Sequence, residues 1–193
     1  GIATDANKIM GLDIWSNMEA YNIIEHFNYI PDILFSKSLH IFLSDLYLGT
    51  SNPPIGNSEN IIKFLETRLL KIKSGGKSEK LYQLVTQLPQ SSRWEFWKRW
   101  QIEYELINRQ DKKACQYISE ISKINTDHFW QMSRIFCLAI VGKIDQSEFI
   151  LDLIKSRGFS DKIFENLVQI IRDNQKTFIS ENENNKIQPL HVI

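Results

Sequence analysis

The sequence predicts an all-α protein, built as a short right-handed superhelix of about nine helices in antiparallel hairpins. The first observation is a near-repeat with a period of about 34 residues, a length that fits two packed helices and their turns. Asp111 and Asp145 lie one such period apart, and each comes four positions after an aliphatic residue that ends a helix, Ile107 or Val141. The second observation is that apolar residues recur every three or four positions along most of the chain, with no competing strand alternation.

Two helices are predicted before residue 50. A capping pair, Ser16 with Glu19, opens the first helix, and Pro31 ends it. The second helix spans 36–48 and is closed by Gly49. Each has one apolar face at helical spacing, formed by Ala20, Ile23, Ile24 and Phe27 in the first helix and by Leu39, Phe42, Leu43 and Leu46 in the second.

The segment 50–57, TSNPPIGN, is the clearest loop, because two prolines and a glycine oppose regular structure there. We therefore expect a single helical-repeat domain over residues 1–173, in which this loop sets off a two-helix N-terminal part. The remaining residues, 174–193, are polar and without periodicity, and they are predicted to form a tail or arm.

Seven further helices are predicted after the loop. Capping pairs open two of them, Ser92 with Glu95 and Asp145 with Glu148. The short connections between these helices predict antiparallel neighbours that stack in sequence order. The seven predicted ranges are 61–72, 81–88, 92–108, 111–124, 127–141, 145–158 and 161–173.

A weaker third copy of the period is expected before the other two, because Ser74, Asn108 and Gly142 end predicted helices at successive steps of the same length. Three hairpins are about the minimum for a self-supporting solenoid. Ala114 and Ala139 agree with the small-residue positions of tetratricopeptide repeats (TPR), whereas the Trp-Leu-Gly-Tyr spacing of that signature is absent. The predicted fold is therefore a TPR-like α-solenoid.

The charge of the chain excludes two classes of partner. The sequence has 23 basic and 23 acidic side chains, so its formal net charge is zero. This balance provides no electrostatic footprint for nucleic acid or for an anionic membrane surface. No apolar run reaches the roughly 18 residues that a membrane span requires. We therefore expect no direct span, and any membrane association would run through a partner.

No motif indicates catalysis or ligand binding. The four histidines lack the spacing of a metal site, and the run Gly75-Gly76-Lys77-Ser78 lacks the leading glycine of a phosphate-binding loop. We therefore predict no enzyme activity, no catalytic residue, no metal and no cofactor. The segment Ala20-Tyr21-Asn22 resembles a fragment of the active-site signature of soluble lytic transglycosylases, but the rest of that signature is missing.

Cys115 and Cys137 are the only cysteines, and their midpoint, residue 126, falls in a predicted turn. Residues equally far from the turn of an antiparallel helix pair lie at about the same height, so these two side chains can face each other. Two interpretations stay open: a disulfide, or two buried thiols that act as small hydrophobic side chains. A disulfide implies an oxidising compartment and, with no initiator methionine in the sequence, favours the bacterial periplasm. Free thiols favour the cytoplasm.

The helix predicted over 92–108 carries the best candidate for a partner-binding site. Its tryptophans recur every three residues and form, with a tyrosine four residues further on, an aromatic stripe flanked by an arginine. One interpretation is a core stripe between repeats. The other is a groove lined by aromatic and arginine side chains, which are frequent hot spots of protein interfaces. The candidate residues, one of them from the helix predicted over 127–141, are Arg93, Trp94, Trp97, Trp100, Tyr104 and Trp130.

The sequence from about Leu39 to Phe164 resembles a family of uncharacterised bacterial envelope helical-repeat proteins. The resemblance implies a helical-repeat fold and both cysteines, and it transfers no catalytic residue. The matching features are the Pro53-Pro54 loop, the helix that contains Ala114-Cys115, and the segment HFWQMSRIFCLAIVGK with Trp130, Gln131, Phe136, Cys137 and Gly142.

These features favour a non-enzymatic helical-repeat scaffold that binds protein partners in a bacterial envelope assembly. Two alternatives stay open: an accessory or regulatory domain of a peptidoglycan-active enzyme, and a cytosolic adaptor with free thiols. The redox state of Cys115 and Cys137 separates the exported scaffold from the cytosolic adaptor.

Overall fold

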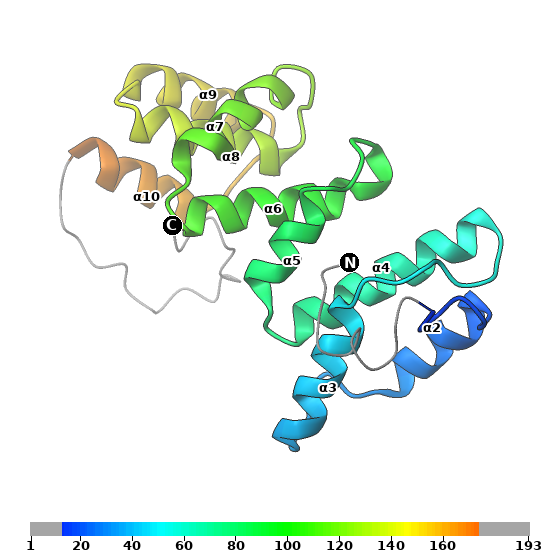
Figure 1. Ribbon diagram of the computed structural model, residues 1–193. Coiled ribbons are helices and arrows are strands. Elements are labelled where there is room, and N and C mark those ends of the chain that lie inside the picture. The colour runs from blue at the N-terminus through cyan, green and yellow to red at the C-terminus, as the bar shows by residue number, and fades with distance from the viewer. Residues whose placement is uncertain (1–12, 174–193) are drawn as a thin grey trace. The chain divides into compact units, whose positions relative to one another are not determined.

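The structure is a computed structural model that describes residues 13–173, and over this range the chain is all-α (Figure 1). Nine α-helices and one 3-10 helix follow one another there without a strand. The predicted all-α class and number of helices are therefore confirmed. The predicted tail, 174–193, lies outside the described residues.

The chain divides into two compact units, residues 1–90 and 91–193. The sequence predicts a single domain with its internal division at loop 50–57, whereas this loop belongs to the first unit. The Ala20 amide donates a hydrogen bond to the Ile55 carbonyl at 2.8 Å, and the Ile55 amide donates to the Met18 carbonyl at 2.9 Å. This isolated parallel bridge fixes the loop beside the start of the first described helix.

The first unit has a central helix and an aromatic core. Its described helices are α2 (Ala20–Tyr29), α3 (Lys37–Leu48), α4 (Ser58–Ser74) and α5 (Ser78–Val85). Helix α4 packs against each of the other three. The ring centroid of Phe27 lies 5.0 Å from that of Tyr47 and 5.5 Å from that of Trp15, both in edge-to-face contact. These rings join α2 and α3 beside α4.

The second unit is built around α8. Its described elements are η1 (Ser92–Trp94), α6 (Glu95–Ile107), α7 (Asp111–Ile121), α8 (His128–Ile140), α9 (Ile144–Ser156) and α10 (Lys162–Asp173). Helix α8 packs against α7, α9 and α10. It buries side chains around most of its circumference, and Trp130 and Ile135 are fully buried. This explains why α8 lacks the polar face of a surface helix.

One turn geometry recurs at the α4–α5, α6–α7 and α8–α9 connections. Gly76, Arg109 and Gly142 have φ of 70°, 57° and 77°, and the next helix begins two residues later each time. A left-handed residue after a helix reverses the chain, and glycine adopts it without strain. Successive turns are separated by the same number of residues, which is one fewer than the predicted period. The predicted period is the distance from Asp111 to Asp145, but Asp111 is the first residue of α7 whereas Asp145 is the second residue of α9.

The buried positions follow the same even spacing as the turns. Two sets of three buried residues, given at the end of this paragraph, have one member on the first helix of each hairpin. The three hairpins therefore bury equivalent residues. Whether the hairpins form a TPR-like superhelix stays a prediction. The two evenly spaced sets are Phe64, Trp97 and Trp130, and Leu69, Ile102 and Ile135.

The three predicted capping pairs are wrong. The residue before α2, α6 and α9 makes no side-chain cap bond in any of the three. Helix α6 follows a 3-10 turn, and α9 begins one residue before Asp145 because the recurring turn sets its start. Side chains that do cap a helix, by accepting a hydrogen bond from a backbone amide in its first turn, are those of Ser36, Asn57, Asp127 and Asp161.

Candidate functional site

The six residues that the sequence predicts to bind a partner differ in how much of each side chain is exposed. Trp94, Trp97 and Trp130 are 5%, 3% and 0% exposed, so these rings do not line an open surface. Trp97 and Trp130 also occupy equivalent positions in two successive hairpins, which is typical of core residues. Those that keep more contact with solvent are the half-buried Trp100 and Tyr104 and the exposed Arg93.

An ionic and aromatic cluster joins the start of α6 to the start of α8, and we name it the Arg99 cluster (Glu95, Arg99, Asp127, Phe129 and Trp130). The Trp130 indole N–H donates to Glu95 Oε1 at 2.7 Å. The Arg99 guanidinium lies 3.3 Å from Glu95 Oε1 and 3.2 Å from Asp127 Oδ2. Its central carbon lies 5.3 Å from the centroid of the Phe129 ring. The cluster therefore ties the first helices of two successive hairpins together.

The sequence indicates Asp127 only as a helix start and Glu95 only as a capping residue. In the structure Asp127 serves two contacts, because its Oδ1 accepts from the Phe129 amide at 2.9 Å while its Oδ2 pairs with Arg99. Glu95 and Trp130 lie 35 residues apart. This separation is close to the predicted repeat period, and that is the one signal in the sequence that could have indicated the contact.

Glu95→Ala is expected to lower the free energy of unfolding of the second unit by about 1–2 kcal/mol, because a buried indole N–H then loses its acceptor. Glu95→Gln keeps an acceptor oxygen and is expected to lose less than half of that. Arg99→Ala is expected to cost less than about 1 kcal/mol, because its ion pairs are partly exposed. Urea unfolding followed by circular dichroism measures all three, and a larger cost for Arg99→Ala than for Glu95→Ala would contradict this order.

A polar row on α6 contains the buried Lys98 and Glu105 and the half-buried Gln101. Lys98 Nζ donates to Gln101 Oε1 at 3.3 Å, and Gln101 Nε2 donates to Glu105 Oε1 at 3.0 Å. Lys113 of α7 pairs with Glu105 at 3.2 Å. Burial lowers the pKa of the Lys98 ammonium, and the negative charge of Glu105 opposes that shift. The opposite charges of the row therefore compensate one another. Because the pair between Lys113 and Glu105 joins two helices, this network holds α6 on α7.

One side of α6 carries the α6 aromatic face (Phe96, Trp100, Tyr104 and Ile107), because these residues fall within an arc of roughly 80° on the helix. Trp97 lies at the edge of this arc and is buried. Trp100 and Tyr104 are stacked, with ring centroids 5.4 Å apart and an interplanar angle of 27°. Trp97 meets Trp100 edge-on at 6.3 Å. Phe96 and Ile107 are 52% and 53% exposed. A partner would therefore meet a surface whose rings already hold one another in place.

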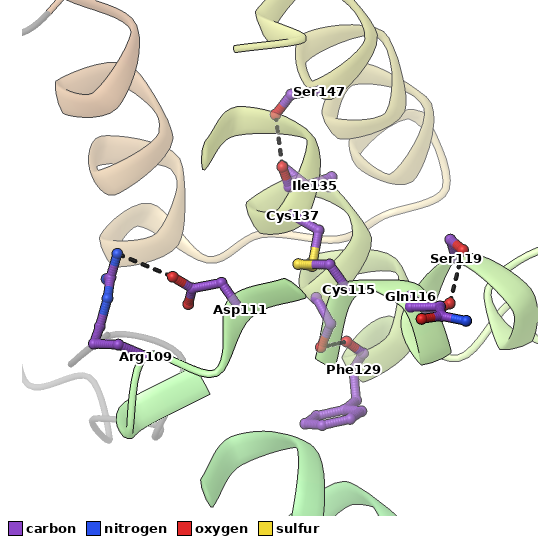
Figure 2. Close-up of a disulfide and its surroundings, with 10 residues drawn as sticks. Arg109, Asp111, Cys115, Gln116, Ser119, Phe129, Ile135, Cys137 and Ser147 are labelled. Carbon is purple, nitrogen blue, oxygen red and sulfur yellow. Dashed lines mark hydrogen bonds and ion pairs between the residues drawn. A yellow bond between two sulfur atoms is a disulfide. The ribbon is translucent and has the colours of Figure 1, made fainter. Parts of the chain in front are cut away.

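Cys115 of α7 and Cys137 of α8 form a disulfide, with their Cα atoms 5.5 Å apart (Figure 2). Of the two interpretations that the sequence leaves open for these cysteines, the structure has the disulfide. Cys137 is buried in the core of the unit, whereas Cys115 is half-buried. Helix α8 is also tied to α9, because the Ser147 hydroxyl donates to the Ile135 carbonyl at 3.0 Å, as Figure 2 shows.

The sequence does not predict the exposed apolar surface of α3. The predicted stripe of this helix divides, because Leu43 is buried whereas Leu39 and Phe42 are 45% and 48% exposed. Phe35, which lies just before the helix, is 103% exposed. The side of α3 that packs inward is formed by Leu43, Ser44, Tyr47 and Leu48.

Within residues 13–173, no helix is both long and apolar enough to cross a lipid bilayer. The same range contains no group of three or more His, Cys, Asp or Glu side chains placed to hold a metal ion. No protein-family model, no curated protein and no solved structure matches the chain. The resemblance to envelope helical-repeat proteins therefore stays a prediction.

Proposed function

We propose that this protein is a non-enzymatic TPR-like scaffold that binds a protein partner through the α6 aromatic face. The observation that carries the proposal is the stacked pair of Trp100 and Tyr104 beside the exposed Phe96 and Ile107. Aromatic side chains supply much of the energy of protein interfaces, and rings that are already ordered lose little entropy on binding. Arg93, at the start of this segment, would contribute to a polar rim.

The repeat character of the hairpins supports the scaffold. Three hairpins share one turn geometry and two evenly spaced sets of buried positions. Within the second unit, α8 packs against the helices that precede and follow it. Repeats of a solenoid contact their nearest neighbours in this way, and solenoids bind partners along the extended surface that the stack creates.

The scaffold would act in a bacterial envelope assembly, in the periplasm. The Cys115–Cys137 disulfide supports this setting, because disulfides persist in oxidising compartments and are rare in the cytosol. Membrane association would then run through the bound partner.

Site-specific photo-crosslinking in the native host tests the partner-binding face. A photoreactive amino acid at Ile107 is expected to give a protein adduct that the same amino acid at Ile124 does not give. Ile124 is a matched control, because it is 83% exposed and lies between α7 and α8, outside the α6 aromatic face. Adding Trp100→Ala to the Ile107 probe is expected to reduce the adduct about tenfold, the effect of losing a moderate hot spot.

Equal adducts at both probe positions, or no adduct at Ile107, would contradict the proposed face. Alkylation of the same cells under denaturing, non-reducing conditions tests the compartment, since free thiols then react even where the fold buries them, whereas an oxidised pair resists the reagent. Free thiols at Cys115 and Cys137 in the native host would contradict an exported setting and would favour the cytosolic adaptor.

A further inference from the structure

The first unit contains a cavity of about 250 Å³ between α4 and the end of α5. The side chains that line it are apolar, except for those of Arg68 and Gln87. A cavity of about 150 Å³ can hold one benzene molecule, so this one has room for roughly ten non-hydrogen atoms. Its apolar wall is formed by Leu65, Leu69 and Ile72 of α4 and by Leu84, Leu88 and Pro89 of α5 and the segment that follows it.

Arg68, in the wall of this cavity, keeps hydrogen-bond donors that the protein does not use. A guanidinium has five N–H groups. In Arg68, Nε donates to the Tyr47 carbonyl and Nη2 donates to the Gly49 carbonyl. Among the described residues, both N–H groups of Nη1 and the second N–H of Nη2 therefore have no acceptor. They include the parallel pair by which a guanidinium binds the two oxygens of a carboxylate.

The positive charge of Arg68 is only partly compensated. Arg68 is 7% exposed, and none of the ion pairs between described residues includes it. Burial alone lowers its pKa, with no opposing contribution from a nearby carboxylate. The C-terminal end of α3 supplies about half of a negative charge. A buried cation in this position favours an anion, and the cavity beside it has room for one.

We propose that this cavity binds a small amphiphilic carboxylate, with the carboxylate on Nη1 and Nη2 of Arg68 and a short apolar chain against the leucines. Ligand sites are commonly of this kind, an apolar wall with a few polar groups that orient the ligand. A neutral molecule of the same shape would leave the guanidinium uncompensated, and an amphiphilic cation would be repelled by it. The cavity belongs to the first unit, so this inference is independent of the α6 aromatic face.

Isothermal titration calorimetry of the full chain with octanoate, which matches the cavity in size, tests the proposal. One octanoate is expected to bind per chain with a Kd on the order of 0.1 mM, a typical affinity for a ligand this small. Octanol and octylammonium are expected to bind at least about tenfold more weakly, because neither offers an anion to Arg68. Absence of saturable octanoate binding, or equal affinities for octanoate and octanol, would overturn the proposal.

Two tryptophan variants locate the binding. Leu88→Trp fills part of the cavity and is expected to abolish octanoate binding. Leu70→Trp is the matched control, because Leu70 of α4 is 49% exposed and does not line the cavity, and it is expected to bind octanoate as the unmodified chain does. Circular dichroism checks that both variants fold. Equal octanoate binding by the two variants would place the ligand elsewhere and overturn the proposal.

Arg68→Lys gives a second readout should Leu88→Trp fail to fold. A lysine ammonium keeps the charge but lacks the fork of a guanidinium. The variant is therefore expected to lose about tenfold in affinity for octanoate and to keep its affinity for octanol. An unchanged ratio of the two affinities would show that Arg68 does not bind the carboxylate.

Discussion

Loss of the Cys115–Cys137 disulfide is expected to lower the free energy of unfolding of the second unit by about 3 kcal/mol. The bond joins residues 22 apart in the sequence, and closing a loop of that length restricts the unfolded chain by about this amount. It also joins α7 to α8, the helix against which α9 and α10 pack. Loosening this junction therefore affects the whole unit. Urea unfolding with and without reductant, followed by circular dichroism, measures the loss.

The double variant Cys115→Ala/Cys137→Ala separates the effect of the bond from that of the reductant. It is expected to unfold near the lower urea midpoint of the reduced chain and to be insensitive to reductant. Alanine at position 137 leaves a small cavity, because Cys137 lies in the core, and this adds up to about 1 kcal/mol. Identical midpoints for the oxidised and the reduced chain would contradict the expected role of the disulfide.

The helices and the disulfide could be predicted because both depend on spacing along the chain. Cys115 and Cys137 lie equally far from residue 126, and two antiparallel helices rise by the same amount per residue, so they bring the two side chains to one height. Helix starts are harder to predict. Asp145 resembles Asp111 in the sequence, yet it comes one position later in its helix because the turn at Gly142 sets the start.

The partner-binding residues show what spacing cannot decide. Trp94, Trp97 and Trp100 recur every three residues, a pattern that a core stripe and a surface stripe share, and the structure buries the first two while it leaves Trp100 half-buried. Burial depends on neighbours that are distant in the sequence. Helix α3 presents the same difficulty, because seven of its 12 residues are aliphatic or aromatic and surround the helix. Its sequence therefore does not show which side the rest of the unit covers.

Arg68→Met is expected to lower the free energy of unfolding of the first unit by about 3–5 kcal/mol. Arg68 of α4 is 7% exposed, and its guanidinium donates to the Tyr47 and Gly49 carbonyls at the end of α3. Burial lowers the pKa of Arg68 to about 10, so the group stays charged at neutral pH, where the negative end of the α3 dipole stabilises it. Methionine fills a similar volume but leaves both carbonyls without these donors.

The matched control is Arg68→Lys, which keeps the charge. A lysine ammonium lacks the fork of a guanidinium and can satisfy one of the two carbonyls, so about half of the stability is expected to return. Hydrogen exchange locates the effect: the amides of α3 are expected to exchange faster in Arg68→Met than in Arg68→Lys, because the Tyr47 and Gly49 carbonyls belong to the end of this helix. Unchanged exchange in α3 would show that Arg68 does not hold the helix.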